Sequence, residues 1–431
     1  MLVRKLQRLL LSGREASARM LLHAERLEYC HRYCTNARSV ILGIETSCDD
    51  TAVGIVDDNG NILGEAAHSQ LAIHIEYGGI IPPIARDMHK ENIARVTEDA
   101  LRHCAVPIEE MTAIAVTNRP GMSLSLRVGA DHAIELARRY CKPLIPVHHM
   151  EAHATAVRLQ HRVDFPYLVL LVSGGHCQLA VVRAIDDFLL LGQTIDDAPG
   201  EAMDKVARRL KLHNLPECRL LSGGAAIELL ARGANPLAFP FPEPMTDYRT
   251  CDFSFSGFKN SVYREIVRLE KQHGIEADGL VPELRDVCAS AQRAMVQHLV
   301  RRTHRALEFC TREGLLPPLP SEEAEITQGE EASPTLVVAG GVACNSVLRD
   351  ALAQLCNHLG AIFVATPANL CSDNGLMIAW NGLERYRASA VPAVGDLSAF
   401  RVEPRCILGT DISQSVAKAS IKLRKIKLKI G

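Results

Sequence analysis

The chain has 431 residues, of which 47% are hydrophobic and 23% are charged, a composition typical of a globular protein with room for two or more lobes. The formal net charge is −2, and without the basic residues 1–38 it is −7, which is not the charge of a typical nucleic-acid binder. No apolar run is long enough to cross a bilayer. We therefore expect no membrane insertion. The 14 cysteines include no Cys-x-x-Cys pair and indicate free thiols in a reducing compartment.

Residues 1–38 differ from the rest because they carry eight basic and only three acidic residues, with no acid before Glu15. Leu2, Leu6 and Leu9 recur at helical spacing in the same segment. A basic, amphipathic start that is poor in acids is typical of a mitochondrial presequence, so we predict import into the mitochondrial matrix. The alternative is a basic amphipathic helix that stays on the protein.

The first apolar strand, Val40–Ile44, leads into a polar tip and then into a second strand, Ala52–Val56. This pattern predicts a hairpin whose tip presents hydroxyl, carboxylate and backbone N–H groups. The same plan recurs at Tyr167–Val172 and Cys177–Val182, with Ser173–His176 as the tip. Two such units predict an internal duplication, in which two α/β lobes face each other across a cleft.

Further α/β elements lie between and after the hairpins. A glycine pair, Gly340-Gly341, separates the last expected strand from a helix, and such a pair lets the backbone approach a ligand closely. The expected elements are strands at Ile114–Thr117, Pro143–Val147 and Thr335–Ala339, and helices at Leu126–Tyr140 and Asn345–Cys356.

Composition also marks two segments outside the core. Pro317–Pro334 holds five glutamates and four prolines and is expected to be a flexible acidic surface loop. Ile421–Lys429 is basic and either binds phosphates or forms an edge strand guarded by lysines. The expected domains are a presequence (1–38), a first lobe (39–165 plus 367–405), a second lobe (166–366) and a basic tail (406–431).

Two histidines, His149 and His153, are spaced to lie on one face of a helix, one turn apart. A distant loop supplies a carboxylate, Asp373. Two imidazoles and one carboxylate make a three-ligand metal site with an open position, and this ligand set suits one divalent ion, zinc or iron. The alternative is a surface helix with histidines at this spacing and no metal. The spacing does not match a zinc-protease motif, because Glu151 follows His149 by two residues.

Seven motifs in order carry a specific resemblance over roughly residues 39–405. On these motifs the chain resembles the universal threonylcarbamoyl-adenosine tRNA synthase family, and most of all its mitochondrial branch. The motifs are Gly43–Thr51, His149–His153, Leu171–His176, Ile195–Lys205, Phe253–Gly257, Ala339–Asn345 and Cys371–Gly375.

The resemblance implies two actin-like, ribonuclease-H-like lobes around a nucleotide cleft. It implies transfer of a threonylcarbamoyl group from threonylcarbamoyl-AMP to N6 of the adenosine 3′ of the anticodon, in mitochondrial tRNAs that read codons starting with A. AMP is released. The implied partners are tRNA and threonylcarbamoyl-AMP, and the mitochondrial branch implies a homodimer.

The same resemblance assigns residues by position. His149, His153 and Asp373 match the family's metal ligands. Residues that match substrate contacts are Val172, Ser173, Gly174, Gly175 and His176 near the acyl phosphate, Asp204, Gly224 and Glu228 on the ribose and base, and Cys344 and Asn345 on the third glycine loop.

Several roles remain open from sequence alone. Asp50 is our candidate for a catalytic carboxylate that orients the attacking amine or takes its proton, and its alternative role is to cap the turn. His176 either contacts the carbamate or is a structural histidine between strands. Asp196 and Asp197 either line the cleft or, as we favour, cap the helix that carries Asp204. The segment Phe253–Gly257 favours packing over chemistry.

The chain departs from the family pattern at three places. Asp50 stands where the family often has glutamate, and Pro83 stands where it usually has another glutamate, so no role of that acid transfers. The family's Pro-Gly-Gly-Pro ribose loop is replaced by Ser222–Ala225, which places Glu228 four residues after Gly224.

Two other functions fit the superfold. One is an ATP-dependent small-molecule kinase, against which the histidine pair argues, because such kinases hold magnesium through phosphates and carboxylates. The other is a nucleotide-binding, chaperone-like protein without catalysis. Fold alone does not separate these functions, because one superfold hosts many activities.

Overall fold

The computed structural model describes residues 38–319, 333–389 and 397–430. Nearly all of the expected presequence and most of the acidic loop 317–334 lie outside the described residues, so both stay predictions. The chain from Val40 onward forms one compact unit.

The first sheet consists of β1 (Val40–Glu45), β2 (Asp50–Asp57), β3 (Ile62–Ser69), β4 (Ala113–Arg119) and β5 (Leu144–His148). Its strand order is β3-β2-β1-β4-β5. The pairs β1–β2 and β2–β3 are antiparallel, whereas β1–β4 and β4–β5 are parallel. Every residue of β1 is buried, which explains the apolar run Val40–Ile44 before its final Glu45: the strand is covered on both faces.

The second sheet consists of β6 (Tyr167–Val172), β7 (Cys177–Ala184), β8 (Asp187–Gln193), β9 (Thr335–Ala339), β10 (Ile362–Ala365) and β11 (Thr410–Asp411). Its order is β10-β9-β6-β7-β8-β11. Strands β6 to β10 repeat the order and the directions of β1 to β5, with antiparallel β6–β7 and β7–β8 and parallel β6–β9 and β9–β10. The predicted duplication is therefore confirmed, and each lobe has the ribonuclease-H-like arrangement.

Helices pack on the sheets, and the helix expected at Leu126–Tyr140 begins earlier, at Ser123. The α-helices are α2 (Leu71–Glu76), α3 (Pro82–Arg102), α4 (Ser123–Arg139), α5 (His149–Thr155), α6 (Pro199–Arg209), α7 (Gly223–Ala231), α8 (Ser256–His273), α9 (Leu284–Arg312), α10 (Ser346–Leu359), α11 (Gly375–Arg387) and α12 (Ser413–Ala419). Short 3-10 helices are η1 (Ile108–Glu110), η2 (Ala156–Leu159), η3 (Leu212–Asn214), η4 (Pro216–Cys218), η5 (Gly341–Cys344), η6 (Ala368–Leu370) and η7 (Leu397–Ala399).

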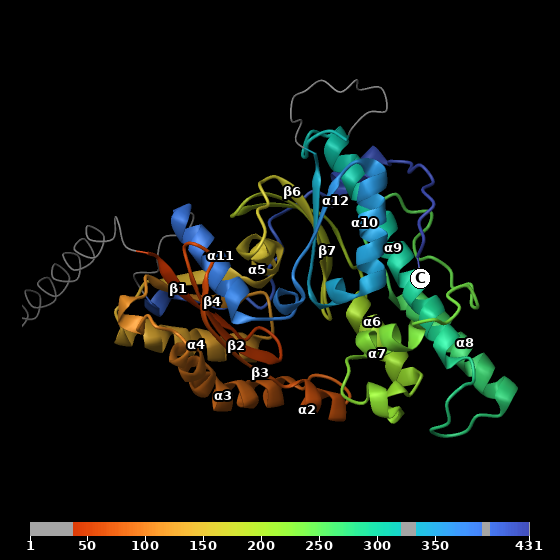
Figure 1. The fold of residues 1–431 in the computed structure, drawn as a ribbon, viewed down its shortest axis with the longest axis horizontal. Coiled ribbons are helices and arrows are strands. Elements are labelled where there is room, and N and C mark those ends of the chain that lie inside the picture. Colours follow the sequence, from red (N-terminus) through yellow and green to blue (C-terminus); the bar gives the residue numbers. More distant parts are fainter. Residues whose placement is uncertain (1–37, 320–332, 390–396, 431) are drawn as a thin grey trace, which may run out of the picture. The chain divides into compact units, whose positions relative to one another are not determined.

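Helix α5, which carries the two candidate metal histidines, lies between the two sheets (Figure 1). Ala152 and Ala156 belong to the apolar cluster under the first sheet. Met150 and Ala154 belong to the cluster against β6 and β9 of the second sheet. All seven residues of α5 are buried, so the helix is held from both sides and its histidines sit at the junction of the lobes.

Helix α11 packs very closely on the first sheet because glycines face each other there. A Cβ on Gly375 would lie 2.1 Å from the backbone N of Gly54, and a Cβ on Gly43 would lie 2.2 Å from the backbone N of Ala379. No side chain fits at these contacts. The glycines therefore set how near α11, and the loop in front of it, comes to the sheet.

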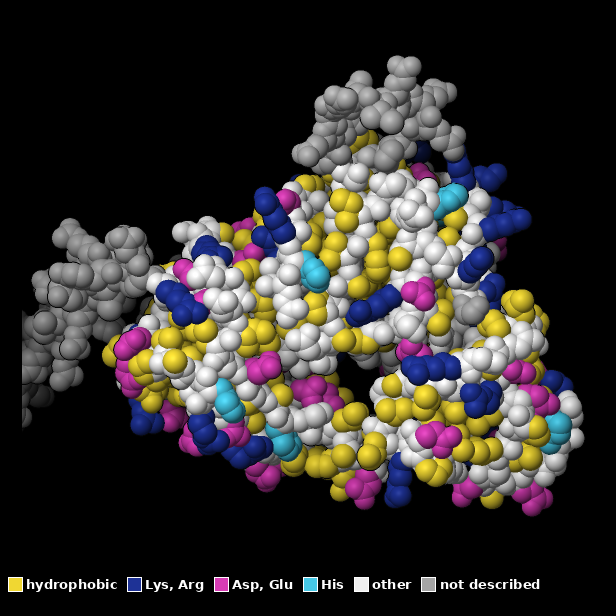
Figure 2. Space-filling view, in the orientation of Figure 1, with side chains coloured by type: hydrophobic (Ala, Val, Ile, Leu, Met, Phe, Trp, Pro, Cys, Tyr) yellow, Lys and Arg dark blue, Asp and Glu magenta, His cyan; other side chains and the backbone are white. Residues whose placement is uncertain are grey.

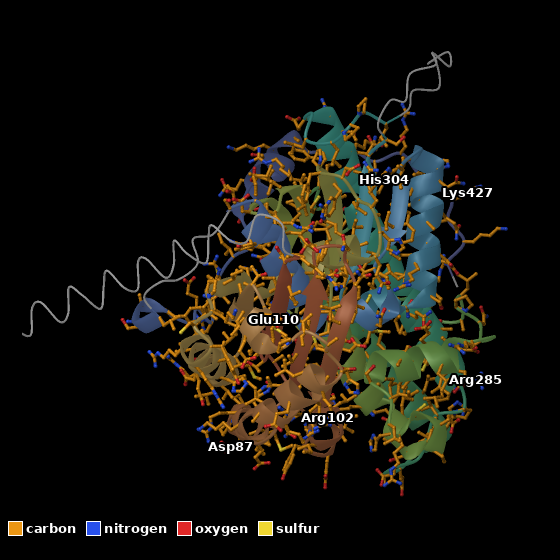
Figure 3. The ribbon with its side chains drawn as sticks, turned by 60° about the vertical axis from the view of Figure 1, so that its left-hand side comes forward. Asp87, Arg102, Glu110, Arg285, His304 and Lys427 are labelled. Atoms are coloured by element: carbon orange, nitrogen blue, oxygen red, sulfur yellow. The ribbon has the colours of Figure 1, made fainter. Side chains whose placement is uncertain are left out.

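The C-terminal segment belongs to the second lobe. Strand β11 pairs with β8, and Ile421 and Ile430 are buried in the core cluster of that lobe. Residues 421–430 form no strand, so the edge strand that we considered is wrong. The lysines of this segment are exposed, and Figure 3 shows the side chain of Lys427 pointing away from the ribbon.

Within the described residues, no helix is both long and apolar enough to span a membrane. The cysteines of the same residues are all free thiols, as expected from the sequence.

Candidate active site

His149, His153 and Asp373 meet, although the aspartate is 220 residues from His153 in sequence. Oδ1 of Asp373 lies 3.0 Å from Nε2 of His153 and 3.6 Å from Nε2 of His149. One possible ligand atom from each of the three residues lies within 4.8 Å of the other two. Both histidines are buried, whereas the carboxylate of Asp373 is 21% exposed and gives access from solvent.

Contacts between α5 and α11 hold the three side chains in place. Asp373 directly precedes Asn374, whose side chain caps α11 by accepting a hydrogen bond from Met377 N at 2.8 Å. Glu151 forms a buried ion pair with Arg385. Thr155 Oγ1 accepts a hydrogen bond from Asn381 at 3.1 Å. The two elements that carry the triad are therefore fixed relative to each other.

A residue that the sequence did not single out, Glu45, supports His149. Oε2 of Glu45 lies 3.2 Å from Nδ1 of His149, and Ser47 Oγ lies 3.1 Å from the same nitrogen. Glu45 is fully buried and also accepts a hydrogen bond from Thr117 Oγ1 at 2.5 Å. A glutamate at the end of an otherwise apolar strand was the only signal. A carboxylate on the far nitrogen fixes the ring and its tautomer, as around many metal-binding histidines.

Charges oppose each other strongly in this cluster. Burial lowers the pKa of His149, but Asp373 and Glu45 outweigh it and raise that pKa to about 9. Burial raises the pKa of Asp373, yet His149 and His153 bring it far below its ordinary value. Two carboxylates therefore face His149 and favour a cation at this site, either a proton on the imidazole or a metal ion in its place.

The donor set fits a divalent metal ion. Ligand bonds of about 2 Å from two imidazole nitrogens and one carboxylate oxygen need ligand atoms about 3–4 Å apart, and the separations of 3.0 and 3.6 Å meet this. Three protein ligands leave coordination positions open for water or substrate.

The tip of the second hairpin approaches the triad. The ring of His176 lies 6.3 Å from that of His149, centroid to centroid. The tip is closed by hydrogen bonds from Ser173 N to His176 O, at 2.9 Å, and from His176 N to Ser173 Oγ, at 3.1 Å. Burial, with the charges of His149 and His153, lowers the pKa of His176 to about 4, so its ring is neutral.

The glycines of this tip leave its backbone accessible. A Cβ at Gly174 or Gly175 would meet nothing within 4 Å. The side chain of Val172 is buried in the second-lobe core, so only its backbone faces the tip. Gly340, with φ +98°, lies against that backbone: a Cβ there would be 2.3 Å from Val172 O. The glycine pair thus brings the third glycine loop against the end of β6.

The candidate nucleotide residues form a second cluster. At the start of α6, Glu201 N donates to Gly174 O at 3.2 Å, which joins this helix to the second tip. The same helix carries Asp204, whose Oδ1 accepts from Gly224 N at 3.3 Å. Burial raises the pKa of Asp204, although these backbone donors oppose the shift.

Helix α7 connects this cluster to the third glycine loop. Oε2 of Glu228 accepts from Asn345 Nδ2 at 3.2 Å, and its Oε1 accepts from Ser346 N at 3.0 Å. A Cβ at Gly224 would meet nothing within 4 Å, so that backbone is open. The structure therefore brings Asp204, Gly224, Glu228 and Asn345 together, as the alignment through Ser222–Ala225 requires.

Asp50 begins β2, next to the first tip. Its Oδ1 is buried and has no hydrogen-bond partner within the described residues. Burial, together with the charges of Asp49 and Asp373, outweighs a hydrogen bond with Ser69 and raises the pKa of Asp50 to about 7. His89 holds the same tip through Cys48 O at 3.0 Å. A carboxyl group with a pKa near neutrality can exchange protons readily.

The role that we favoured for Asp196 and Asp197, capping the helix that carries Asp204, is wrong. Helix α6 has no side-chain cap. Asp196 instead accepts from Phe255 N at 2.8 Å and Ser256 N at 3.3 Å, at the start of α8, and Asp197 pairs with Lys205 and Lys259. Both stabilise the second lobe.

The segment Phe253–Gly257 packs as expected. Phe253 and Phe255 are fully buried, and each ring meets His298 edge to face. Among the departures from the family pattern, Pro82 and Pro83 occupy the first turn of α3, where proline is favoured.

The two lobes are also in contact at the loop that precedes α3 in the chain, where Arg208 of α6 donates a hydrogen bond to Gly78 O. Figure 2 shows the opening that remains on this face between the first-lobe strands and α6.

Comparison with known proteins agrees with this geometry. The family model described as tRNA N6-adenosine threonylcarbamoyltransferase matches residues 61–380. The chain is 46% identical over 398 residues to the mouse protein named tRNA N6-adenosine threonylcarbamoyltransferase, mitochondrial, covering 92% of this chain and 93% of that protein. It is 47% identical to the human protein of that name (91% of each chain) and 44% identical to the tRNA N6-adenosine threonylcarbamoyltransferase of Sinorhizobium medicae (82% and 92%).

Similar solved structures are more distant. HypF of T. kodakarensis is 13% identical with a TM-score of 0.48, covering 83% of this chain and 48% of that one. Component A of (R)-2-hydroxyglutaryl-CoA dehydratase from Acidaminococcus fermentans is 14% identical with a TM-score of 0.44, covering 82% and 100%.

Proposed function

Since the chain belongs to the tRNA N6-adenosine threonylcarbamoyltransferase family and modifies N6 of adenosine in tRNA, we propose that threonylcarbamoyl-AMP is its donor and that AMP leaves. We further propose that the acceptor is the adenosine 3′ of the anticodon in mitochondrial tRNAs that read codons starting with A. The observation that carries this proposal is the continuous line of contacts from the metal triad, through the second tip, to the nucleotide cluster.

The family is metal-dependent, and His149, His153 and Asp373 are the residues that would hold the ion. We propose zinc or ferrous iron, because neutral imidazole nitrogen suits both. When bound, the ion would stabilise negative charge on phosphate or carbamate oxygens. Glu45 supports this role because its carboxylate keeps Nε2 of His149 turned toward Asp373.

We propose that the tip Ser173–His176 receives the acyl-phosphate end of the donor. Two glycines with open space above them expose backbone N–H groups that suit phosphate oxygens. The neutral ring of His176 can contact the carbamate without bringing a charge.

Asp204, Gly224, Glu228 and Asn345 would hold the adenosine part of the donor. Carboxylates suit ribose hydroxyls, since each can accept two hydrogen bonds. Cys344 lies on the same loop as Asn345, at its exposed side.

Asp50 is proposed as the catalytic carboxylate. The N6 amine of adenosine is a weak nucleophile, since its lone pair is delocalised into the purine, so a group that orients it or takes its proton speeds the attack. The unpartnered Oδ1 and the pKa of about 7 support this role.

Neither alternative function is favoured. The matched family and the named relatives are transferases, and the His–His–Asp donor set is not the phosphate-and-carboxylate arrangement that a magnesium-dependent kinase uses. A non-catalytic nucleotide-binding protein has no need of the triad.

The mammalian relatives carry mitochondrial names, so the chain is assigned to the mitochondrion. We propose the matrix as its compartment, supported by the basic start of the sequence. We also propose a homodimer, by resemblance to the mitochondrial branch. Light scattering of the purified protein tests this assembly.

Reconstitution tests the function. Purified metal-loaded protein is incubated with threonylcarbamoyl-AMP and unmodified tRNA, and the nucleosides are measured by mass spectrometry. The proposal expects threonylcarbamoyl-adenosine only when donor, tRNA and protein are all present. A folded, metal-loaded protein that yields no product would refute the donor and acceptor proposed here.

A further inference from the structure

The last described residues of the chain form a basic segment, Ile421–Ile430, which the site described above does not use. Its five apolar side chains pack on the core of the second lobe. They are Ile421, Leu423, Ile426, Leu428 and Ile430. Its five basic side chains are all exposed. They are Lys422, Arg424, Lys425, Lys427 and Lys429. The basic segment therefore presents its apolar side chains to the protein and its positive charges to solvent.

Hydrogen bonds fix the backbone of the basic segment on the second lobe. Just before its start, Arg249 Nη1 donates to Ser420 O at 3.2 Å. Near its end, Lys429 N donates to Gln354 Oε1 at 2.9 Å, and Gln354 Nε2 donates to Lys429 O at 3.0 Å. Figure 1 shows the end of the chain beside α10, the helix that carries Gln354. The exposed charges therefore extend from a backbone that is held in place.

The positive charge of the basic segment is not neutralised locally. Residues 412–431 contain six basic residues and no acidic residue. Within the part of the chain that the structure describes, none of the five exposed basic side chains is in an ion pair. The chain without residues 1–38 has a net charge of −7. A negatively charged protein that acts on tRNA needs a local positive surface for the phosphates of its substrate.

We propose that the basic segment binds backbone phosphates of the tRNA and positions the tRNA on the second lobe. Phosphate contacts fix the orientation of a nucleic acid on a protein but do not read its sequence. The metal triad lies at the junction of the lobes, so the segment would hold the body of the tRNA and not the reacting adenosine. This inference deepens the proposed function and rests on it for the acceptor.

The burial pattern favours RNA over a membrane surface as the partner. Anionic lipids also attract lysines. A segment that lies in a membrane interface inserts an apolar side into the lipid, however, and the apolar side chains of this segment already pack on the second lobe. Backbone phosphates need only the exposed positive charges.

Binding of an unmodified mitochondrial tRNA transcript, measured without donor, tests this surface. Lys422→Gln, Lys425→Gln and Lys427→Gln are combined in the full-length protein. We expect the affinity at about 0.15 M salt to fall about 10- to 100-fold, and the slope of log K against log salt concentration to become about 2–3 less steep. Arginine at the same three positions keeps the charge and should restore wild-type binding. All variants keep residues 1–38, so this other basic segment contributes equally.

The matched control removes three positive charges at exposed positions outside the basic segment, through Lys90→Gln, Arg138→Gln and Lys271→Gln. Its affinity and salt slope should stay near those of wild type. Equal losses in the two triple variants, or no loss in the segment variant, would overturn the proposal. It would also be overturned if the segment variant lost binding to vesicles of anionic phospholipid while its affinity for tRNA was unchanged.

Lysine labelling of the wild-type protein, with and without tRNA, decides the question even if a variant fails to fold. The lysines of the basic segment should react more slowly when tRNA is bound, and equal labelling in both samples would contradict the proposed surface. Mass spectrometry of the peptides measures this. Lys90 and Lys271 serve as internal controls in the same samples.

Transfer kinetics separate this inference from the proposed function. The segment variant should have a higher KM for tRNA and an unchanged kcat, because the adenosine still reacts in the same site. Wild-type protein that binds tRNA but forms no product would count against the proposed function. Wild-type affinity for tRNA in the segment variant would count against the surface alone.

Discussion

Glu45 lies 3.2 Å from His149, measured from Oε2 to Nδ1, and this contact turns the other ring nitrogen of His149 toward Asp373. The glutamate lies at the end of β1 and the histidine at the start of α5, so the contact joins the first sheet to the helix between the sheets. The geometry of the proposed metal ligands thus depends on a buried residue outside the triad.

Replacing this carboxylate by an amide should weaken metal binding. We expect Glu45→Gln to lower metal affinity about 10- to 100-fold, the usual effect of losing a partner that orients a ligand. Competition with a chelator, followed by metal analysis, measures it. Glu65→Gln, on exposed β3 of the same sheet, is the matched control and should bind metal as wild type does. Equal affinities in the two variants would contradict this role of Glu45.

The raised pKa of Asp50 predicts a dependence of stability on pH. The group has a reference pKa of 3.8 and a folded pKa of about 7, so the folded protein binds more protons than the unfolded chain between these values. The free energy of unfolding should therefore fall as pH rises from about 4 to 7, and Asp50→Asn should remove this loss. At pH 8 we expect the metal-free variant to be more stable than wild type by about 2–4 kcal/mol.

Urea unfolding of both proteins at pH 4.5 and pH 8, with a chelator present, checks this. The difference between the variants should be small at the lower pH and large at the higher one. If the two proteins differed in free energy of unfolding by the same amount at both pH values, Asp50 would not be the source of the pH dependence.

Gly375 should tolerate no side chain. Gly375→Ala places a Cβ 2.1 Å from Gly54 N, so α11 must move away from the sheet, at a cost of about 3 kcal/mol or more. Gly257→Ala, in α8 and with nothing within 4 Å of its Cβ, should be neutral or slightly stabilising. Thermal unfolding compares the two. Similar melting temperatures would mean that α11 does not pack as described.

Asp204 and Glu228 should contribute to binding the adenylate. Hydrogen bonds to charged groups are worth about 1.5–3 kcal/mol, so Asp204→Asn or Glu228→Gln should weaken AMP binding about 10- to 100-fold. Calorimetric titration measures this, with Glu217→Gln, an exposed glutamate outside the cluster, as the control. Unchanged affinity in both cluster variants would place the nucleotide elsewhere.

Much of the fold could be predicted because its strands are strongly patterned. Val40–Ile44 and Tyr167–Val172 are unbroken apolar runs followed by polar tips, and both are central strands of their sheets. The histidine pair was also readable, since i and i+4 spacing fixes one helical face. Contact with Asp373 came from the family resemblance, because no local pattern links residues so far apart.

What the sequence missed depends on tertiary contacts. Asp196 precedes α6 in sequence and looks like its cap. In the structure its carboxylate instead accepts a hydrogen bond from Phe255 N at the start of α8, 59 residues later. Glu45 looked like one more polar residue of a tip, because its partner is brought near only by the fold. An edge strand was one of two alternatives for the basic tail, yet residues 421–430 form no strand, and Ile421 and Ile430 pack in the second-lobe core.

The most direct test of the central claim is to measure bound metal and threonylcarbamoyl-adenosine in parallel, for wild type and Asp373→Asn, with donor and tRNA supplied. Loss of the only carboxylate of the triad should release the metal. Product formation should then fall about 10²-fold or more, because the ion is expected to lower the energy of the charged transition state by several kcal/mol. A folded Asp373→Asn protein that contains no metal and forms product at the wild-type rate would contradict the account.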